Sequence, residues 1–407
     1  MRSAPLSAGT PRVLLFTGKG GVGKTTASAA TAAAAAARGS KTLVLSTDAA
    51  HSLADALATP LHAEPTEVDT GLYAMQVDTQ AAFERTWRDV QGYLLGLLER
   101  AGVDALQAEE LTVLPGAEEV LALLELTRQV TTGPWDLVVV DCAPTGETLR
   151  LLALPEALSW YVDKVFPAQR RALRAVRPLL SRVSGPAVPR DDLFDAVERL
   201  HRELLQVRAV LTAPSTSVRV VLTPEAVVVA EARRTLTSLA LYGYRVDALI
   251  ANRVFPTTSS EPFLAGWAAA QASQLAVVRA DAGPLPVLES PYRPAEPVGL
   301  AALVEVGEAL YGGSDPGAPS AQDAGEDLVA VARTADGFEL SLALPLARRD
   351  DLQLSRSGDE LVLTVAGHRR VLGLPSALRR CLVAGAVLAD GRLLVRFEPD
   401  PALWRQS

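Results

Sequence analysis

The feature that most constrains this chain is a glycine-rich loop near its amino terminus. Residues 18–26 read Gly-Lys-Gly-Gly-Val-Gly-Lys-Thr-Thr, after an apolar run at 13–16 and before a long alanine-rich stretch. Strand, loop and helix in that order turn successive backbone N–H groups toward a polyphosphate, with glycines where a side chain would block the approach. The pattern predicts a phosphate-binding loop formed by Gly18, Lys19, Gly20, Gly21, Val22, Gly23, Lys24, Thr25 and Thr26.

The residue types in the loop indicate how it would hold a nucleotide. Lys24 is placed to reach the β- and γ-phosphates, and the Thr25 hydroxyl is placed to ligate Mg²⁺. Lys19 is a second lysine at the start of the loop, in a chain whose basic residues are otherwise almost all arginine. A compact ammonium fits among phosphate oxygens where a broad guanidinium does not, which favours a functional role for both loop lysines.

Composition excludes several classes of protein. The chain has 407 residues and a formal net charge of −8, which argues against a general nucleic-acid binder. Its two cysteines, Cys142 and Cys381, cannot form a disulfide framework or a cysteine-rich zinc site. The first ten residues lack the apolar core of a signal peptide, and the alanine run at 27–37 is too short to span a membrane. We therefore expect a cytoplasmic protein without stable membrane insertion.

Short apolar runs alternate with helical patterns over most of the chain. Nearly continuous apolar strands of this kind are typical of a parallel sheet covered on both faces. The sequence predicts a doubly wound, mostly parallel α/β sheet with ligands at the carboxyl ends of its strands. The predicted strands are 13–16, 42–45, 72–77, 137–140, 218–222 and 248–251.

Two stretches show helical periodicity without intervening strands. Apolar residues recur at steps of three and four over 83–98 and again over 193–211. The segment between them, 156–183, is apolar and basic and is interrupted by prolines, which predicts a kinked or split helix. These patterns predict a helical subdomain, at about 82–130 and 155–213, mounted on the sheet.

The pattern changes near the carboxyl end. Residues 313–326 are low in complexity and can bury little, so they are interpreted as a linker that ends a first domain at 1–312. Beyond them apolar residues alternate with period two, and Asp336-Gly337 and Asp390-Gly391 are typical of tight turns. Residues 327–407 are therefore predicted to form a small antiparallel β-sandwich.

Two aspartates follow predicted strands at the edge where the phosphate loop would lie. Asp48 comes just after the strand at 42–45, and Asp141 just after the strand at 137–140. Asp141 suits a direct or water-mediated contact with Mg²⁺, and Asp48 suits alignment of an attacking water, with a water-mediated contact to the metal. A single strand-end aspartate can merely cap the next helix, but two of them beside one phosphate loop favour a catalytic interpretation.

These segments together resemble a known family. The loop GKGGVGKTT, the segment Asp48-Ala-Ala-His-Ser-Leu and the segment Asp141-Cys-Ala-Pro-Thr-Gly-Glu-Thr-Leu-Arg are similar to those of arsenite-pump ATPases and of tail-anchored-protein-targeting (guided-entry) ATPases. The resemblance covers roughly residues 10–311. Shorter matches lie at 115–119, 223–225, 252–253 and 290–291.

The resemblance implies a homodimeric enzyme that hydrolyses ATP to ADP and phosphate with Mg²⁺. Lys19 would then reach the partner subunit's nucleotide, with an effect like that of an arginine finger. Asp48 would position water in a first switch and Asp141 would lie in a second. Asn252 and the loop at Pro291 would hold the adenine.

The carboxyl-terminal sandwich resembles a small-heat-shock (α-crystallin-like) domain. Leu374-Pro375 and the strand entry from Ala386 to Leu393 carry that similarity, and a subgroup of the ATPase family has such an appendage.

The chain departs from the family pattern in ways that bear on function. Ala49 stands where many members have proline, and Glu147 stands where the second switch often has histidine. No Cys-x-x-Cys pair is present, so the zinc clasp of the targeting-factor dimers is missing, as is the cysteine cluster of the arsenite pumps. Only two methionines occur, so the pliable methionine-rich groove of a tail-anchor carrier is absent.

The leading hypothesis is a homodimeric, Mg-ATP-dependent switch that shelters a hydrophobic client segment and acts in chaperoning or membrane-protein targeting. One alternative is an ATPase associated with arsenite or antimonite efflux. Another is a positioning ATPase of the kind that places division or partition machinery, although the chain's last residues are too short for an amphipathic anchor. A small-molecule kinase is disfavoured, because no second substrate pocket is visible in the sequence.

Overall fold

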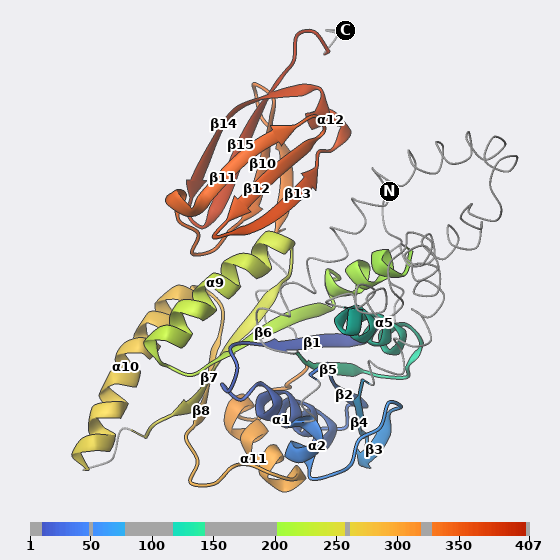
Figure 1. Ribbon diagram of the computed structural model, residues 1–407, viewed down its shortest axis with the longest axis vertical. Helices are drawn as coiled ribbons and strands as arrows, with labels where there is room; N and C mark the ends of the chain where they lie inside the picture. The colour runs from blue at the N-terminus through green and yellow to red at the C-terminus, as the bar shows by residue number, and fades with distance from the viewer. Residues whose placement is uncertain are drawn as a thin grey trace, which may run out of the picture.

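The computed structural model describes residues 10–48, 52–77, 117–142, 202–256, 261–318 and 328–403, with the side chains of 117–120 excepted. An eight-stranded sheet flanked by helices forms the larger unit, and two smaller sheets form the carboxyl-terminal one (Figure 1). The strands of the large sheet are β1 (Arg12–Thr17), β2 (Thr42–Ser46), β3 (Thr66–Asp69), β4 (Leu72–Gln76), β5 (Leu137–Asp141), β6 (Thr216–Leu222), β7 (Val246–Val254) and β8 (Val287–Pro291).

The large sheet has the order β3-β4-β2-β5-β1-β6-β7-β8, and all neighbours are parallel except β3 and β4. The predicted parallel α/β class is therefore confirmed, and all six predicted strands coincide with β1, β2, β4, β5, β6 and β7. Strands β3 and β8 were not predicted. Both are half-exposed, with the sequences TEVD and VLESP, so neither shows the continuous apolar run that marks the buried strands.

Helices cover the two faces of this sheet (Figure 1). Helix α1, which is rich in alanine and nearly all buried, packs on the strands together with α2 and α11. On the other face lie α5, a helix at 202–211 and α9, and α10 packs against α9 and β7. None of the described helices is long and apolar enough to cross a membrane. The helices are α1 (Lys24–Ala37), α2 (Ser52–Leu57), α5 (Ala117–Thr132), α9 (Ala226–Tyr242), α10 (Pro262–Ala282) and α11 (Leu300–Tyr311).

Most of the predicted helical subdomain falls outside the described residues. Helix α5 and the helix at 202–211 belong to it, whereas residues 82–116 and 155–201 are not described. The proposed boundaries at 312 and 326 also remain predictions, since residues 319–327 are not described.

A buried ionic network ties β1, β6 and β7 to the helices below them. Asp247 on β7 has a side chain that is 1% exposed. Its carboxylate accepts hydrogen bonds from the guanidinium groups of Arg12 at 3.0 Å and Arg219 at 3.1 Å. The Arg219 guanidinium also donates to the Tyr311 hydroxyl at 2.9 Å, and that hydroxyl lies 2.6 Å from the hydroxyl of Thr31. One carboxylate therefore balances two guanidinium groups in the interior of the sheet.

The substitution Asp247→Ala is expected to destabilise the fold strongly, because it leaves two largely buried guanidinium groups without their carboxylate. Breaking a buried ion pair from one side costs about 3–5 kcal/mol of unfolding free energy. Urea unfolding monitored by circular dichroism measures the loss. The matched control is Glu289→Ala, which removes the partner of an exposed arginine, Arg279. We expect a change below about 1 kcal/mol there, and equal losses in both variants would contradict the assignment.

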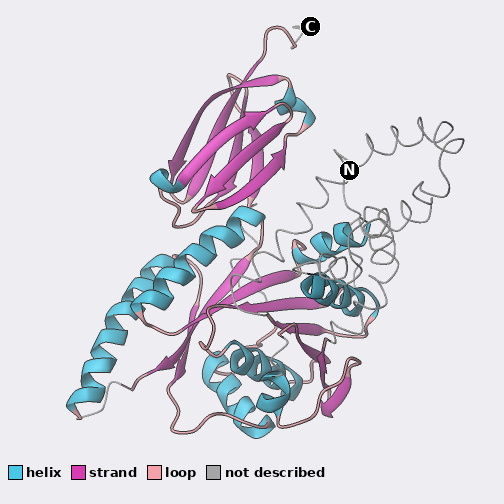
Figure 2. Cartoon of the chain, viewed as in Figure 1, coloured by secondary structure: helices cyan, strands magenta, loops and turns pink. Residues whose placement is uncertain are grey.

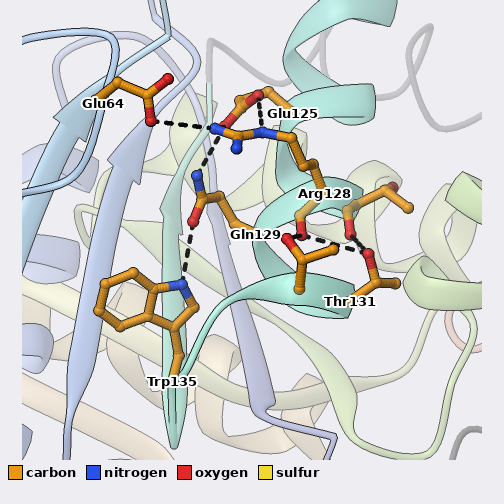
Figure 3. Close-up of polar contacts among 8 residues, drawn as sticks. Glu64, Glu125, Arg128, Gln129, Thr131 and Trp135 are labelled. Atoms are coloured by element: carbon orange, nitrogen blue, oxygen red, sulfur yellow. Dashed lines mark hydrogen bonds and ion pairs between the residues drawn. The ribbon is translucent and has the colours of Figure 1, made fainter.

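A second polar cluster lies at the amino ends of the strands (Figure 3). Arg128 of α5 donates twice to Glu125, at 2.7 and 2.9 Å, and reaches Glu64 at 3.4 Å. Gln129 donates to Glu125 and accepts at 3.1 Å from the indole of Trp135, just before β5. The cluster fixes α5 against the sheet at the edge opposite the glycine-rich loop, and it therefore serves the fold.

The carboxyl-terminal unit is a sandwich of two antiparallel sheets, ordered β14-β15-β10-β9 and β11-β12-β13 (Figure 2). Alternate residues of β10, β12 and β15 point into a common core, as the period-two pattern predicted. The strands are β9 (Val329–Arg333), β10 (Phe338–Ala343), β11 (Leu352–Ser357), β12 (Glu360–Val365), β13 (His368–Gly373), β14 (Cys381–Ala389) and β15 (Arg392–Pro399).

Helix α9 joins the two units. Its Leu241 is fully buried and belongs to the apolar core of the sandwich. The buried Arg370 of β13 donates to the Leu241 carbonyl at the end of the helix, where a cation is favoured by the helix dipole. The Thr237 hydroxyl donates to the Pro345 carbonyl at 2.7 Å. The sandwich is therefore docked on a helix that also packs on the large sheet and on α10.

Candidate nucleotide-binding site

The glycine-rich loop runs from the end of β1 to the start of α1, as predicted. Gly18 has φ 153° and lies against β6, where an added Cβ would overlap the carbonyl oxygen of Val221. Gly23 has φ 93° and precedes the first turn of α1, where a Cβ would overlap the amide nitrogen of Asn252. The helix amino terminus, with its free N–H groups, therefore opens onto the carboxyl edge of the sheet, which is the arrangement that binds phosphate.

The two loop lysines lie in different surroundings. Lys24 is buried at the start of α1, and its Nζ is 3.4 Å from the carbonyl oxygen of Lys19. The side chain of Lys19 is 39% exposed and its Nζ lies 4.0 Å from Glu231 of α9. One ammonium is therefore held inside the loop, while the other is accessible at the surface of the molecule.

The two predicted aspartates come together at the ends of neighbouring strands. Ser46 of β2 and Asp141 of β5 are register partners, and the Ser46 hydroxyl donates to Asp141 at 3.5 Å. The same hydroxyl accepts from the backbone N–H of Asp48 at 3.2 Å. Thr25 and Lys24 approach from the loop and interact electrostatically with Asp141. The structure thus brings together Lys24, Thr25, Asp48 and Asp141, as the sequence predicted.

The environment of Asp141 fits a cation site. The residue is 1% exposed, and burial raises its pKa to about 7, with the charge of Asp48 acting in the same direction. The hydroxyl groups of Thr25 and Ser46 and the charge of Lys24 oppose that rise. Its Oδ1 atom is buried and has no hydrogen-bond partner among the described residues. A buried carboxylate oxygen beside a threonine hydroxyl is the kind of ligand that Mg²⁺ uses.

This pKa predicts a pH dependence that Asp141→Asn removes. Between pH 4 and 7 the folded protein binds the Asp141 proton more tightly than the unfolded chain does, so rising pH reduces stability. In nucleotide-free, metal-free buffer, the stability of Asp141→Asn relative to wild type should therefore increase over this range, by about 1.4 kcal/mol per unit of pKa shift. Urea unfolding at pH 5 and pH 8 checks this, with the exposed Asp350→Asn as control. A difference that does not change with pH would contradict the expectation.

A cavity of about 370 Å³ lies beside the loop, on the side away from Asp141. Asn252 of β7 and Pro291 of β8 both line it, together with Thr26 of α1 and Tyr292. The Asn252 amide donates to the Val22 carbonyl at 2.8 Å, so the cavity wall is bonded to the loop itself. The structure thus brings together the two residues that the resemblance assigned to adenine.

Two residues that the sequence interpretation gave no role also shape the site. Gln76, at the end of β4, donates to the Asp48 carbonyl at 2.7 Å. Arg253 has a left-handed backbone, with φ 57°, and its guanidinium donates to the Gly21 carbonyl at 3.0 Å. In the sequence, the position of the polar Gln76 at the end of an apolar strand could have indicated a role at this edge of the sheet. Nothing in the sequence indicated the backbone of Arg253.

Some predicted features fall outside the described residues. They include Ala49 and Glu147, the two departures from the family pattern, and the whole segment 143–150 that follows Asp141.

Comparison with known proteins gives the family. Residues 11–312 match the family model described as anion-transporting ATPase, and residues 335–397 match an HSP20-like domain found in ArsA proteins. A Chlorobaculum tepidum protein with the provisional name arsenical pump-driving ATPase is 36% identical over 95% of this chain and 96% of its own. The Streptomyces coelicolor protein SCO2128 is 39% identical over 97% of this chain and 99% of its own. ATPase GET3B of Arabidopsis thaliana is 31% identical over 75% of this chain and 80% of its own.

These matches extend over both units of the chain, and they confirm the resemblance inferred from the loop and the strand-end aspartates. The protein is an ATPase, and the chain belongs to the anion-transporting (ArsA) ATPase family, in a form that carries an HSP20-like domain at its carboxyl end.

Proposed function

We propose that this ATPase is a homodimeric, Mg-ATP-dependent switch that shelters hydrophobic segments of client proteins. One observation carries the proposal: the loop lysine Lys24, the hydroxyl of Thr25 and two strand-end carboxylates meet at one point, while Lys19 of the same loop is exposed. The first four groups suit nucleotide binding and hydrolysis within one subunit. The exposed ammonium suits a nucleotide in another subunit.

Each residue then has a distinct role. The backbone N–H groups of residues 18–26 and the ammonium of Lys24 hold the phosphates, and Asn252 with the wall at Pro291 holds the adenine. Asp48 orients the attacking water, with its carbonyl anchored by Gln76. Lys19 of the partner subunit stabilises the charge that develops at the transferred phosphoryl group.

Thr25 and Asp141 would hold Mg²⁺, with Asp141 and Asp48 in contact through water. The ion would supply positive charge that polarises the terminal phosphoryl group and orients it for in-line attack. A nearby cation lowers the pKa of a buried carboxyl, so Asp141 would be ionised in that state.

The two units have different roles in this proposal. Residues 1–312 form the ATPase domain, whose helical subdomain shelters the client, and residues 327–407 form the sandwich that assists it, joined by the linker at 313–326. The dimer closes when ATP binds and reopens after hydrolysis, which can drive client release only if the client prefers one of the two states. The relative named ATPase GET3B supports a guided-entry type of role.

The cysteines make metalloid transport the weaker alternative. Trivalent arsenic needs thiolate ligands, and both Cys142 and Cys381 are buried in different units of the molecule. Burial raises the pKa of Cys142 to about 12, and the charge of Asp141 adds to the effect. Stimulation of the ATPase by arsenite or antimonite would favour this alternative.

The dependence of turnover on protein concentration tests the proposal. If the catalytic site needs a lysine from a second subunit, the rate per subunit rises with protein concentration and reaches a plateau when the dimer is saturated. A rate per subunit that stays constant down to concentrations at which the protein sediments as a monomer would refute it. Co-purification of bound polypeptides from cells then identifies the client.

A further inference from the structure

Helix α10 presents an apolar face to the surface. Its inner face packs on the molecule through the buried residues Ala268, Gln271, Leu275, Val278 and Ala282, which follow helical spacing. The outer face begins with Phe263, Leu264 and Trp267, which are 68%, 37% and 42% exposed. No charged side chain occurs from Pro262 to Val278. A surface helix ordinarily has a polar and charged outer face, whereas the outer face of this one carries no charge before Arg279.

These side chains continue into a cluster of aromatic rings. Phe255, just after β7, stacks on Tyr292 with ring centroids 4.7 Å apart and planes at 6°. The same ring lies 6.2 Å from the ring of Trp267, and Tyr292 is itself 50% exposed. We call Phe255, Phe263, Leu264, Trp267 and Tyr292 the aromatic patch. Contiguous exposed apolar surface marks interaction sites, and aromatic residues are enriched at the centres of protein interfaces.

The aromatic patch borders the nucleotide site. Tyr292 lines the cavity assigned to adenine. Arg253, whose guanidinium donates to the Gly21 carbonyl of the loop, precedes Phe255 by two residues. Any molecule that covers the patch therefore lies next to the loop.

Helix α10 is also fixed to the backbone that carries this contact. The buried Gln271 accepts from the Phe255 N–H at 2.7 Å and donates to the Arg253 carbonyl at 3.1 Å. One side chain of the inner face thus holds both residues that connect the patch to the loop. A subunit docked on the outer face of α10 would be positioned relative to the phosphate-binding loop through these bonds.

We propose that the aromatic patch is the surface on which a second copy of this chain docks, patch against patch. The inference rests on the proposed function, because a partner lysine can enter the site only if the partner lies against this edge of the molecule. In a two-fold dimer the same surface meets itself, so like charges would face each other. A face without charge avoids that repulsion and buries apolar surface from both subunits.

The test compares a double variant, Phe263→Ser with Trp267→Ser, with a matched control on the sandwich, Leu382→Ser with Val387→Ser. The control residues are 54% and 48% exposed, so neither pair removes core packing. Sedimentation with a non-hydrolysable ATP analogue measures dimerisation of the full chain. We expect the patch variant to raise the dimer dissociation constant at least tenfold and the control to leave it unchanged.

Turnover gives a second readout. The protein concentration at half-maximal rate should rise by the same factor in the patch variant, while the plateau rate stays near that of wild type. The plateau is preserved because the substituted residues lie outside the phosphate site.

The outcomes separate the two proposals. If wild type remains monomeric with the analogue, the proposed function and this inference both fail. If wild type dimerises and the patch variant dimerises equally well, only this inference is overturned. It is also overturned if the variant loses binding to a hydrophobic helical peptide but keeps its dimer affinity, since the patch would then bind the client.

Cross-linking provides an independent check. Both native cysteines are buried, so Phe263→Cys or Trp267→Cys introduces the reactive thiol. A short bis-maleimide should join two chains through either residue in the presence of the analogue, and Val387→Cys should give no such product. Absence of a cross-link at both positions in a protein that still dimerises would refute the patch-against-patch arrangement.

Discussion

The substitution Lys19→Ala is expected to reduce the rate of ATP hydrolysis by about 10³–10⁵-fold while ATP still binds. A positive charge supplied at the transferred phosphoryl group by a partner has an effect of this size. Lys19 is 39% exposed and its ion pair with Glu231 is at the 4.0 Å limit, so removing the side chain should leave the fold intact. Binding should survive because Lys24 and the loop backbone remain. Single-turnover hydrolysis and equilibrium binding of a fluorescent ATP analogue measure the two effects separately.

Two further variants make this result specific. Lys41→Ala removes the same side chain at the opposite edge of the sheet, where the ammonium lies over the rings of Tyr73 and Trp135, and it should hydrolyse ATP normally. Lys19→Arg keeps the charge but replaces the compact ammonium with a wide planar group, and we expect it to remain impaired. Normal turnover of Lys19→Ala would rule out a trans-acting lysine.

The substitution Asp48→Asn is expected to slow hydrolysis by about 10²–10⁴-fold and to trap ATP in a closed dimer. An amide of the same shape keeps the backbone contacts with Ser46 and Gln76 but cannot take a proton from water. The nucleotide should therefore stay bound through rapid desalting, and the particle should scatter X-rays as a dimer.

The control for this variant is Asp55→Asn, which makes the same chemical change at an exposed residue of α2. It should lose nucleotide and turn over like wild type. Rapid loss of nucleotide from Asp48→Asn would contradict the role given to Asp48, whereas trapping in both variants would point to an indirect effect.

The parallel sheet was predictable because its strands are buried on both faces and bounded by clear turns. Residues 137–141 are an example, since four apolar positions lead to an aspartate and all five are buried. The loop and its two aspartates were predictable because their positions at strand ends follow from the order of elements along the chain. Asn252 and Pro291 were located only through the family resemblance, since their meeting depends on how β7 and β8 pack.

Other features were missed because they depend on contacts between distant segments. The apolar face of α10 is hard to interpret in sequence, because the alanines and glutamines that follow Trp267 are consistent with an ordinary packed helix. Leu241 similarly resembles a core residue of the large sheet, because nothing local indicates that its neighbours come from the sandwich. The contact of Arg253 with the loop requires a left-handed backbone, which arginine seldom adopts and sequence patterns do not reveal.

The docking of the sandwich on α9 affects how the role of that domain can be studied. Deleting residues 328–407 would expose Leu241 to water and take away Arg370, the cation at the helix end. Lower activity after such a deletion would report damage to α9, the helix that also carries Glu231 beside Lys19. Point substitutions at exposed residues of β14, such as Leu382 and Val387, leave this junction intact. They are therefore the informative way to separate the contribution of the sandwich from that of the ATPase domain.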